Sequence, residues 1–333
     1  MRIATYNVEW FNSLFADDNR LLPDDGWSGR RDVTRAQQID ALKVVFATLD
    51  ADAIMVVEAP DQGRTGKTVA ALEHFAAQAG LRARKAIMGF ANDTQQELAL
   101  LFDPDTISAH HDPKGAPDAR AEPRFDGIFQ IDLDVDATED TVRFSKPPLE
   151  LAIETAQGTQ LRMIGAHLKS KAPHGARNRD EVIRISIANR RKQLAQAIWL
   201  RRRIETHLKA GDNLILLGDL NDGPGLDEYE NLFGRSSVEI LMGPELYDPH
   251  ARQALSRSLS AAPTTARFAL PGGERFLQAL LDYIMVTPDL RAKDAKWRIW
   301  HPFDDVACWQ KPGLRDALLT ASDHFPVTMD LDI

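Results

Sequence analysis

The chain opens with an alternation of two apolar patterns, and this alternation limits the folds that it can adopt. Residues 3–8 and 53–59 are short apolar runs typical of buried strands, whereas residues 34–50 and 69–79 repeat apolar side chains at helical spacing. The second helical segment stops at Gly80, and glycine is common immediately after a helix. Strand, helix, strand, helix predicts a layered α/β core.

The rest of the chain is richer in strands. Further strands are predicted at residues 83–88, 97–102, 128–135, 149–155, 161–167, 213–218, 280–286 and 325–331. One long helix is predicted at residues 188–208. Stretches without periodicity are expected to be loops, at residues 12–31, 104–125, 171–180, 223–271 and 297–322. We therefore predict a single domain, residues 1–333, with long loop insertions.

The composition is that of an ordinary globular protein with an acidic balance. The chain has 333 residues, of which 44% are hydrophobic and 27% charged, so it can bury a sizeable core. Its formal net charge of -9 argues against a protein that binds duplex DNA mainly by covering it with Lys and Arg. A local basic groove is still compatible with this charge.

The chain contains one cysteine, Cys308, so it can form neither an internal disulfide nor a thiol metal cluster. This fits a reducing compartment. No apolar segment reaches the roughly 20 residues needed to span a bilayer, and no leader-like apolar segment precedes the first strand. We predict a cytoplasmic protein without a membrane span, and no obligate protein partner is evident.

Polar side chains collect where the apolar runs end. These residues are Asn7, Glu9, Glu58, His167, Asp219, Asn221, Asp282, Asp323 and His324. In the pairs Asn7/Glu9 and Asp219/Asn221, the i, i+2 spacing points both side chains to one side of a strand. Any one of these residues alone would fit a solvated turn or a helix cap. As a group of hard oxygen ligands at strand ends, they predict a site for Mg²⁺ or Mn²⁺.

Together these residues resemble the endonuclease/exonuclease/phosphatase superfamily, the deoxyribonuclease-I-like proteins. The matching stretches follow in the expected order at residues 5–10 (TYNVEW), 56–58 (VVE), 147–149 (PPL), 165–169 (GAHLK), 217–222 (LGDLND), 281–284 (LDYI) and 322–327 (SDHFPV). The resemblance implies an α/β fold of four layers, α/β/β/α, in which two mixed sheets pack face to face and are flanked by helices.

The resemblance also implies a metal site. By that resemblance, Glu58 is the principal metal carboxylate, and Asn7 and Asp323 are supporting ligands. Asp219 resembles the residue that orients or deprotonates the attacking water. Asn221 resembles the residue that positions the phosphate or the nucleophile.

Two histidines also match the family. His324, held by the Asp282 carboxylate, is similar to the essential histidine that contacts the scissile phosphate. His167 matches the second histidine of the branch that contains deoxyribonuclease I and the bacterial sphingomyelinases, where it is a candidate for leaving-group protonation. A histidine near its reference pKa is chemically suited to donate a proton.

Three further residues are candidates for supporting or substrate contacts. Glu9 stands where many family nucleases have Asp, and it is a candidate either to support the metal ligands or to serve as an alternate ligand itself. Lys146 precedes the Pro-Pro pair where relatives often have Arg, as a structural or phosphate-side cation. Lys169 lies two residues after His167 and therefore beside it, which suits a substrate contact. The arginines and lysine at residues 190–192 and 201–203 are expected to form the solvated face of the long helix.

Three functions fit the sequence. The first is a Mg²⁺- or Mn²⁺-dependent phosphodiesterase, with DNA or RNA as the leading substrate class and in-line attack by water as the mechanism. The second is a phosphatase or phosphodiesterase for a small molecule or lipid headgroup, which would use the same residues and differ in its loops. The third is a binding module that has lost catalysis.

Overall fold

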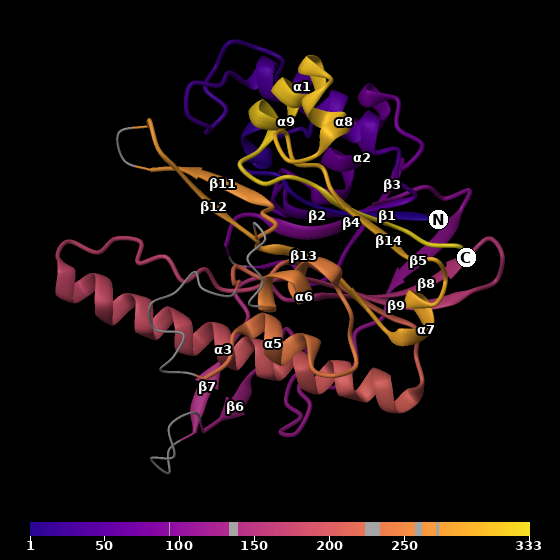
Figure 1. The fold of residues 1–333 in the computed structure, drawn as a ribbon, viewed down its shortest axis with the longest axis vertical. Helices are drawn as coiled ribbons and strands as arrows, with labels where there is room; N and C mark the ends of the chain where they lie inside the picture. The colour runs from indigo at the N-terminus through magenta and orange to yellow at the C-terminus, as the bar shows by residue number, and fades with distance from the viewer. Residues whose placement is uncertain (93, 133–138, 224–233, 257–261, 271–272) are drawn as a thin grey trace.

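A computed structural model of the chain describes residues 1–92, 94–132, 139–223, 234–256, 262–270 and 273–333 (Figure 1). Its strands are β1 (Arg2–Asn7), β2 (Ala53–Ala59), β3 (Lys85–Met88), β4 (Glu97–Phe102), β5 (Ile107–His111), β6 (Phe129–Ile131), β7 (Asp140–Val142), β8 (Leu149–Thr155), β9 (Gln160–His167), β10 (Leu214–Asp219), β11 (Ala266–Ala269), β12 (Phe276–Ala279), β13 (Asp282–Val286), β14 (Lys296–Ile299) and β15 (Val327–Asp330). Its helices are η1 (Phe11–Leu14), α1 (Arg35–Leu49), α2 (Thr68–Ala79), α3 (Arg179–Ala210), α5 (Ser237–Met242), α6 (Pro249–Leu255), α7 (Pro288–Arg291), α8 (Val306–Trp309) and α9 (Pro312–Ala321).

Most of the strands form two mixed sheets. The first sheet has six strands in the order β14-β15-β1-β2-β4-β3, and the second has five in the order β13-β10-β9-β8-β5. Each sheet contains one parallel pair, β1 with β2 and β9 with β10, and the other neighbours are antiparallel. The short hairpins β6-β7 and β11-β12 are separate two-stranded sheets.

The two sheets pack face to face through aliphatic side chains. The buried residues between them include Ile3, Met55, Val57, Leu100, Leu151, Met163, Ile215, Leu217, Ile284 and Met329. Gly165 on β9 allows the sheets to approach closely here, because an added Cβ would collide with the Met55 side chain. Burial of both sheet faces explains why these strands are nearly continuous apolar runs in the sequence.

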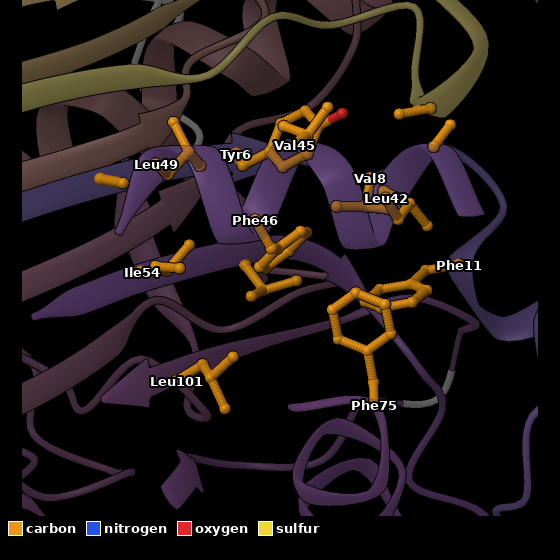
Figure 2. Packing of buried hydrophobic residues seen from close by; sticks show 14 of the residues in the cluster. Tyr6, Val8, Phe11, Leu42, Val45, Phe46, Leu49, Ile54, Phe75 and Leu101 are labelled. Atoms are coloured by element: carbon orange, nitrogen blue, oxygen red, sulfur yellow. The ribbon is translucent and has the colours of Figure 1, made fainter. Parts of the chain in front are cut away.

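Helices cover the outer face of each sheet (Figure 1). Helices α1, α2 and α9 lie on the first sheet, where α1 begins with a capping box between Thr34 and Gln37. Under α1, the rings of Phe11 and Phe46 meet the ring of Phe75 edge to face, at centroid distances of 5.3 and 5.0 Å (Figure 2). Helices α3 and α5 lie on the second sheet. The predicted α/β/β/α order is therefore confirmed.

Helix α3 is longer than predicted. It begins at Arg179, because Asn178 caps it by accepting from the Glu181 backbone N–H. The prediction that its basic residues form a solvated face is wrong for two of them, since Arg190 and Arg203 are buried. Arg203 pairs with Glu150 on β8, so a charge inside the sandwich is compensated by a charge of opposite sign.

Several predicted loops contain regular structure. Strand β5 lies within residues 104–125, α5, α6 and β11 lie within residues 223–271, and α8 and α9 lie within residues 297–322, into which β14 also extends. These elements are short, so their sequences contain too few repeats of either period to be recognised. Parts of the predicted strand 128–135 and of the predicted loop 223–271 lie outside the described residues. Within the described residues, no helix combines the length and apolar character needed to cross a bilayer.

Candidate active site

The strand ends predicted to bear polar residues meet at one edge of the sandwich. Asn7, His167 and Asp219 are the last residues of β1, β9 and β10, and Glu58 is the last but one of β2. Asp219 stands opposite His167 on one side and opposite Asp282 on the other. The carboxyl ends of parallel strands share an edge, which is why residues so distant in sequence come together.

A cleft of about 910 Å³ lies over this edge. The predicted site residues that line it are Asn7, Glu9, Glu58, Lys146, His167, Lys169, Asp219, Asn221, Asp323 and His324. Asp282, the remaining predicted site residue, is buried and is hydrogen-bonded to His324.

The Asp219 carboxylate lies at the centre of the site. Its Oδ2 accepts from Asn7 Nδ2 at 2.9 Å, and its Oδ1 accepts from the Asn221 backbone N–H at 2.7 Å. The Nε2 atoms of His167 and His324 lie 3.8 and 3.9 Å from the same Oδ2. Burial and the nearby Asp282 raise the pKa of Asp219 to about 7, against the opposing effect of His324. Asp219 is therefore a carboxylate that can gain and lose a proton near neutral pH.

His324 is backed by a carboxylate. Its Nδ1 donates to Asp282 Oδ2 at 2.7 Å, and the same oxygen accepts from Thr265 Oγ1 at 2.8 Å. Thr265 Oγ1 also accepts from the backbone N–H groups of Leu281 and Asp282, each at 3.0 Å. Burial disfavours the charged imidazole, but Asp282 outweighs burial and raises the pKa of His324 well above its ordinary value. The pair with Asp282 therefore fixes the orientation of the His324 imidazole and favours its charged form.

The Nδ1 atom of His167, by contrast, is next to the side chain of Lys146. Lys146 Nζ donates to His167 Nδ1 at 3.2 Å and to Gln96 Oε1 at 2.8 Å. The amide of Gln96 in turn donates to Glu58 Oε2 at 2.6 Å. Burial, together with Lys146 and His324, lowers the pKa of His167 well below its ordinary value. The two histidines on either side of Asp219 are thus in opposite electrostatic environments.

Two site residues have a backbone conformation that is rare outside glycine. Glu58 has φ of 61° at the point where the register of β2 against β4 shifts between Val57 and Ala59. Asn221 has φ of 51°, and its side chain donates to the Leu168 carbonyl at 3.1 Å. Such conformations persist only where the surroundings hold them, and they are concentrated at functional sites. The bulge turns the Glu58 side chain into the cleft.

Comparison with known proteins identifies the family. The sequence profile of the endonuclease/exonuclease/phosphatase family matches residues 4–324. The chain belongs to this family. Membership of this family indicates that the protein is a phosphoester hydrolase of the nuclease or phosphatase type. A search of curated protein sequences found no match.

Solved structures of other members have the same fold. Truncated TDP2 from Caenorhabditis elegans superposes with a TM-score of 0.52 at 13% identity, over 98% of this chain and 96% of that one. The 3′ phosphatase NExo from Neisseria gives 0.51 at 17% identity, over 100% of both chains. TDP2 from D. rerio gives 0.51 at 12% identity, over 99% of this chain and 97% of that one. At these identities the likeness concerns the fold.

The family is generally dependent on a divalent metal, and the side chains here fit one. Asn7 Oδ1 is buried and, among the described residues, has no hydrogen-bond partner, so an oxygen ligand is available at the cleft. Burial raises the pKa of Glu58, to which the charge of Asp323 adds, whereas Lys146 and His324 oppose the increase.

One compact group of potential ligands was not expected. Within the described residues, Asp219, Asp282 and His324 offer ligand atoms that all lie within 4.8 Å of one another. The bond between His324 and Asp282 already occupies part of this group.

Glu9 is less suited to bind a metal directly. Its carboxylate pairs with Arg30 and accepts from the Trp10 indole N–H at 2.9 Å. Burial and the charge of Asp323 raise the pKa of Glu9 to about 7. Ser322 orders this side of the cleft, because its hydroxyl donates to the Asn7 carbonyl and accepts from the Glu9 backbone N–H.

The lining of the cleft includes both apolar and basic side chains. The apolar ones include Trp10, between β1 and η1, and Phe268 and Leu277 of the β11-β12 hairpin. The basic ones include Lys169 and also Lys171, which pairs with Asp222. This combination suits a substrate with both an anionic and an apolar part.

Sequence reasoning missed several residues that hold the site together. Gln96 joins Glu58 to Lys146, Thr265 fixes Asp282, and Ser322 fixes Asn7. Gln96 and Thr265 lie in polar stretches outside the family motifs, so no pattern in the sequence marked them. Ser322 begins the matched stretch 322–327, and that position was the available signal.

Proposed function

We propose that the protein is a divalent-metal-dependent phosphodiesterase that acts on nucleic acid. The observation that carries the proposal is the buried Asp219 carboxylate, which lies between the Nε2 atoms of two histidines at the base of a cleft. Hydrolysis of a phosphate ester needs a base for the attacking water, positive charge at the phosphoryl oxygens and a proton for the leaving oxygen. The cleft contains a residue suited to each role.

Asp219 is the proposed base. With a pKa of about 7, its ionised form is populated at neutral pH and still accepts a proton from water. Asn7 and the Asn221 backbone hold its two oxygens, so the carboxylate has one orientation. His324 is the proposed cation at the scissile phosphate, fixed by Asp282.

Glu58, Asn7 and Asp323 are the proposed ligands of Mg²⁺ or Mn²⁺, with Glu9 as an outer carboxylate held by Arg30. When bound, such an ion supplies Lewis acidity that neutralises the non-bridging oxygens of the phosphate. Gln96 fixes Glu58 by donating to Oε2.

Nucleic acid is the proposed substrate because the lining of the cleft matches both of its parts. Lys169 suits a phosphate backbone, and Trp10, Phe268 and Leu277 suit the faces of bases. Support also comes from relatives, since the D. rerio TDP2 structure is a complex with a single strand DNA product and the NExo structure is bound to a product DNA hairpin. We also propose the cytoplasmic location that the sequence predicts.

A substrate panel tests the proposal. Plasmid DNA, single-stranded DNA and RNA, a DNA strand with a 3′ phosphate, bis-p-nitrophenyl phosphate, sphingomyelin and inositol phosphates are assayed with Mg²⁺, with Mn²⁺ and with EDTA. We expect metal-dependent cleavage of nucleic acid that is lost in Asp219→Asn. Cleavage confined to the small molecules or to sphingomyelin would favour the second function. No metal-dependent cleavage at all would favour a binding module.

A further inference from the structure

The hydrogen bond between Lys146 and His167 fixes where the imidazole proton lies. Lys146 Nζ is 3.2 Å from His167 Nδ1 and 2.8 Å from Gln96 Oε1. An ammonium group has three donors and no lone pair, so both of these atoms must accept. Nδ1 is therefore unprotonated, and the proton of the neutral ring is on Nε2, the nitrogen nearer Asp219.

The charges around His167 oppose a second proton on the ring. Lys146 lies against Nδ1, and His324 is a second cation on the far side of Asp219. Asp219 is the carboxylate nearest to Nε2, at 3.8 Å, which is beyond hydrogen-bond length. A second proton would have to go on Nδ1, where it would face an ammonium group instead of an acceptor.

Lys146 is itself held in place. Gln96 accepts from its ammonium and donates to Glu58, so one amide connects the lysine to the proposed metal carboxylate. Gln96 has φ of 79°, and its backbone N–H donates to Asp61 Oδ1. Both the backbone and the side-chain amide of Gln96 are therefore held in place by hydrogen bonds. Burial lowers the pKa of the half-buried Lys146, and the charges of Glu58 and Asp219 oppose this effect.

We infer that Lys146 and Gln96 are positioning residues that keep His167 as a neutral Nε2–H donor, and that His167 binds a non-bridging phosphate oxygen and does not protonate the leaving group. This inference rests on the proposed function and revises the role that the family resemblance implies for His167. The leaving-group proton then comes from His324, whose Nδ1 is bonded to a carboxylate.

The resulting step is balanced. A bond forms between the water oxygen and phosphorus, and Asp219 takes the proton that the water loses. The bond between phosphorus and the leaving oxygen breaks, and that oxygen takes its proton from His324 Nε2. The net reaction adds one water to one ester. Solvent exchange through the open cleft restores both proton states.

Variants of His167 separate a neutral donor from an acid. They are assayed on thymidine 5′-(p-nitrophenyl phosphate), whose leaving group needs no proton, and on the dinucleotide TpT, whose leaving group needs one. The His167→Gln amide reaches the position of Nε2, so we expect a loss of about tenfold or less, against about 100-fold for His167→Asn. For each variant the fold loss should be equal on the two substrates. His110→Gln, at an exposed position in β5, is the matched control.

A much larger loss on TpT than on the p-nitrophenyl ester would show that His167 is the acid and would overturn the inference. Failure of the wild type to cleave either compound would instead count against the proposed function. The two failures are therefore distinguishable.

A second measurement needs no substrate. In ¹⁵N-histidine-labelled protein, the ring shifts of His167, assigned from the spectrum of His167→Gln, report which nitrogen is protonated. We expect the neutral Nε2–H form between pH 6 and pH 8 (roughly the range in which ordinary histidines titrate). Lys146→Met should abolish this preference and Lys146→Arg should keep it. Protonation of both ring nitrogens in the wild type, or unchanged shifts in Lys146→Met, would contradict the inference.

Discussion

The two histidines of the cleft show how one residue type is given two chemical states. His324 and His167 approach the same oxygen of Asp219, at 3.9 and 3.8 Å, and His324 is buried whereas His167 is half-buried. The difference lies behind the rings, where His324 donates to the carboxylate of Asp282 and His167 accepts from the ammonium of Lys146. The partner on Nδ1 therefore sets the charge that each ring presents to the cleft.

The largest effect is expected from Asp219→Asn, which removes the carboxylate that lies between the two histidines. Turnover of a phosphodiester should fall about 10³-fold, because the attacking water loses its base. The melting temperature at pH 8 should be equal to or above that of the wild type, because the buried ionised carboxylate is unfavourable above its pKa of about 7. Turnover is measured by single-turnover kinetics, and the melting temperature is measured by thermal denaturation. Near-normal turnover would remove Asp219 from its proposed role.

Asp282→Asn removes the carboxylate that orients His324. We expect turnover to fall about 10- to 100-fold. The pKa of His324 is raised, so its imidazolium persists above the ordinary range and is lost as pH rises through the raised pKa. The pKa of Asp219 is also raised, so its base form appears as pH rises through about 7. Asp282 contributes to both increases, so both limbs of the pH–rate profile should move to lower pH in the variant. An unmoved alkaline limb would contradict the assignment of His324.

Gln96→Met removes the amide that accepts from Lys146, the partner of His167, and donates to Glu58. The Mg²⁺ concentration for half-maximal activity should rise about tenfold or more, because the metal carboxylate loses its fixed orientation. A titration of activity with Mg²⁺ measures this, with Gln130→Met at an exposed position of β6 as the control. The same requirement for Mg²⁺ in Gln96→Met and the control would show that the amide does not order Glu58.

The smallest effect on activity is expected from Thr265→Val. The Asp282 carboxylate remains, but it loses one donor, so turnover should fall several-fold. Two buried N–H groups lose their acceptor, which should cost about 1–3 kcal/mol in the free energy of unfolding. Thr265→Ser retains the hydroxyl and should be close to wild type in both. Equal behaviour of the valine and serine variants in kinetics and denaturation would show that this hydroxyl is dispensable.

The sequence was sufficient to predict the bounds of the strands that are continuous apolar runs. Strands β2, β4 and β8 begin and end at the predicted residues, because both faces of these strands are covered and few polar residues interrupt them. The four-layer order and the convergence of strand-end residues on one cleft also followed from the motifs.

What the sequence could not give are contacts made by single side chains across the fold. Gln96 and Thr265 are separated from their partners by 38 and 17 positions, and nothing in their own surroundings indicates that they support the site. Likewise, Arg190 and Arg203 have the spacing of helix surface residues, but acidic partners on other elements allow them to be buried. The opposite states of the two histidines depend on such contacts, so they are visible only in the structure.

The most direct test of the account is the metal dependence of phosphodiester cleavage in wild type and in Glu58→Gln. Cleavage of thymidine 5′-(p-nitrophenyl phosphate) is measured in EDTA and after addition of Mg²⁺ or Mn²⁺, and binding of Mn²⁺ is followed in parallel by electron paramagnetic resonance. We predict no cleavage in EDTA, recovery with either ion in the wild type, and weak Mn²⁺ binding with little recovery in Glu58→Gln. Full turnover in EDTA, or equal Mn²⁺ binding and turnover in the variant, would contradict a metal site on Glu58.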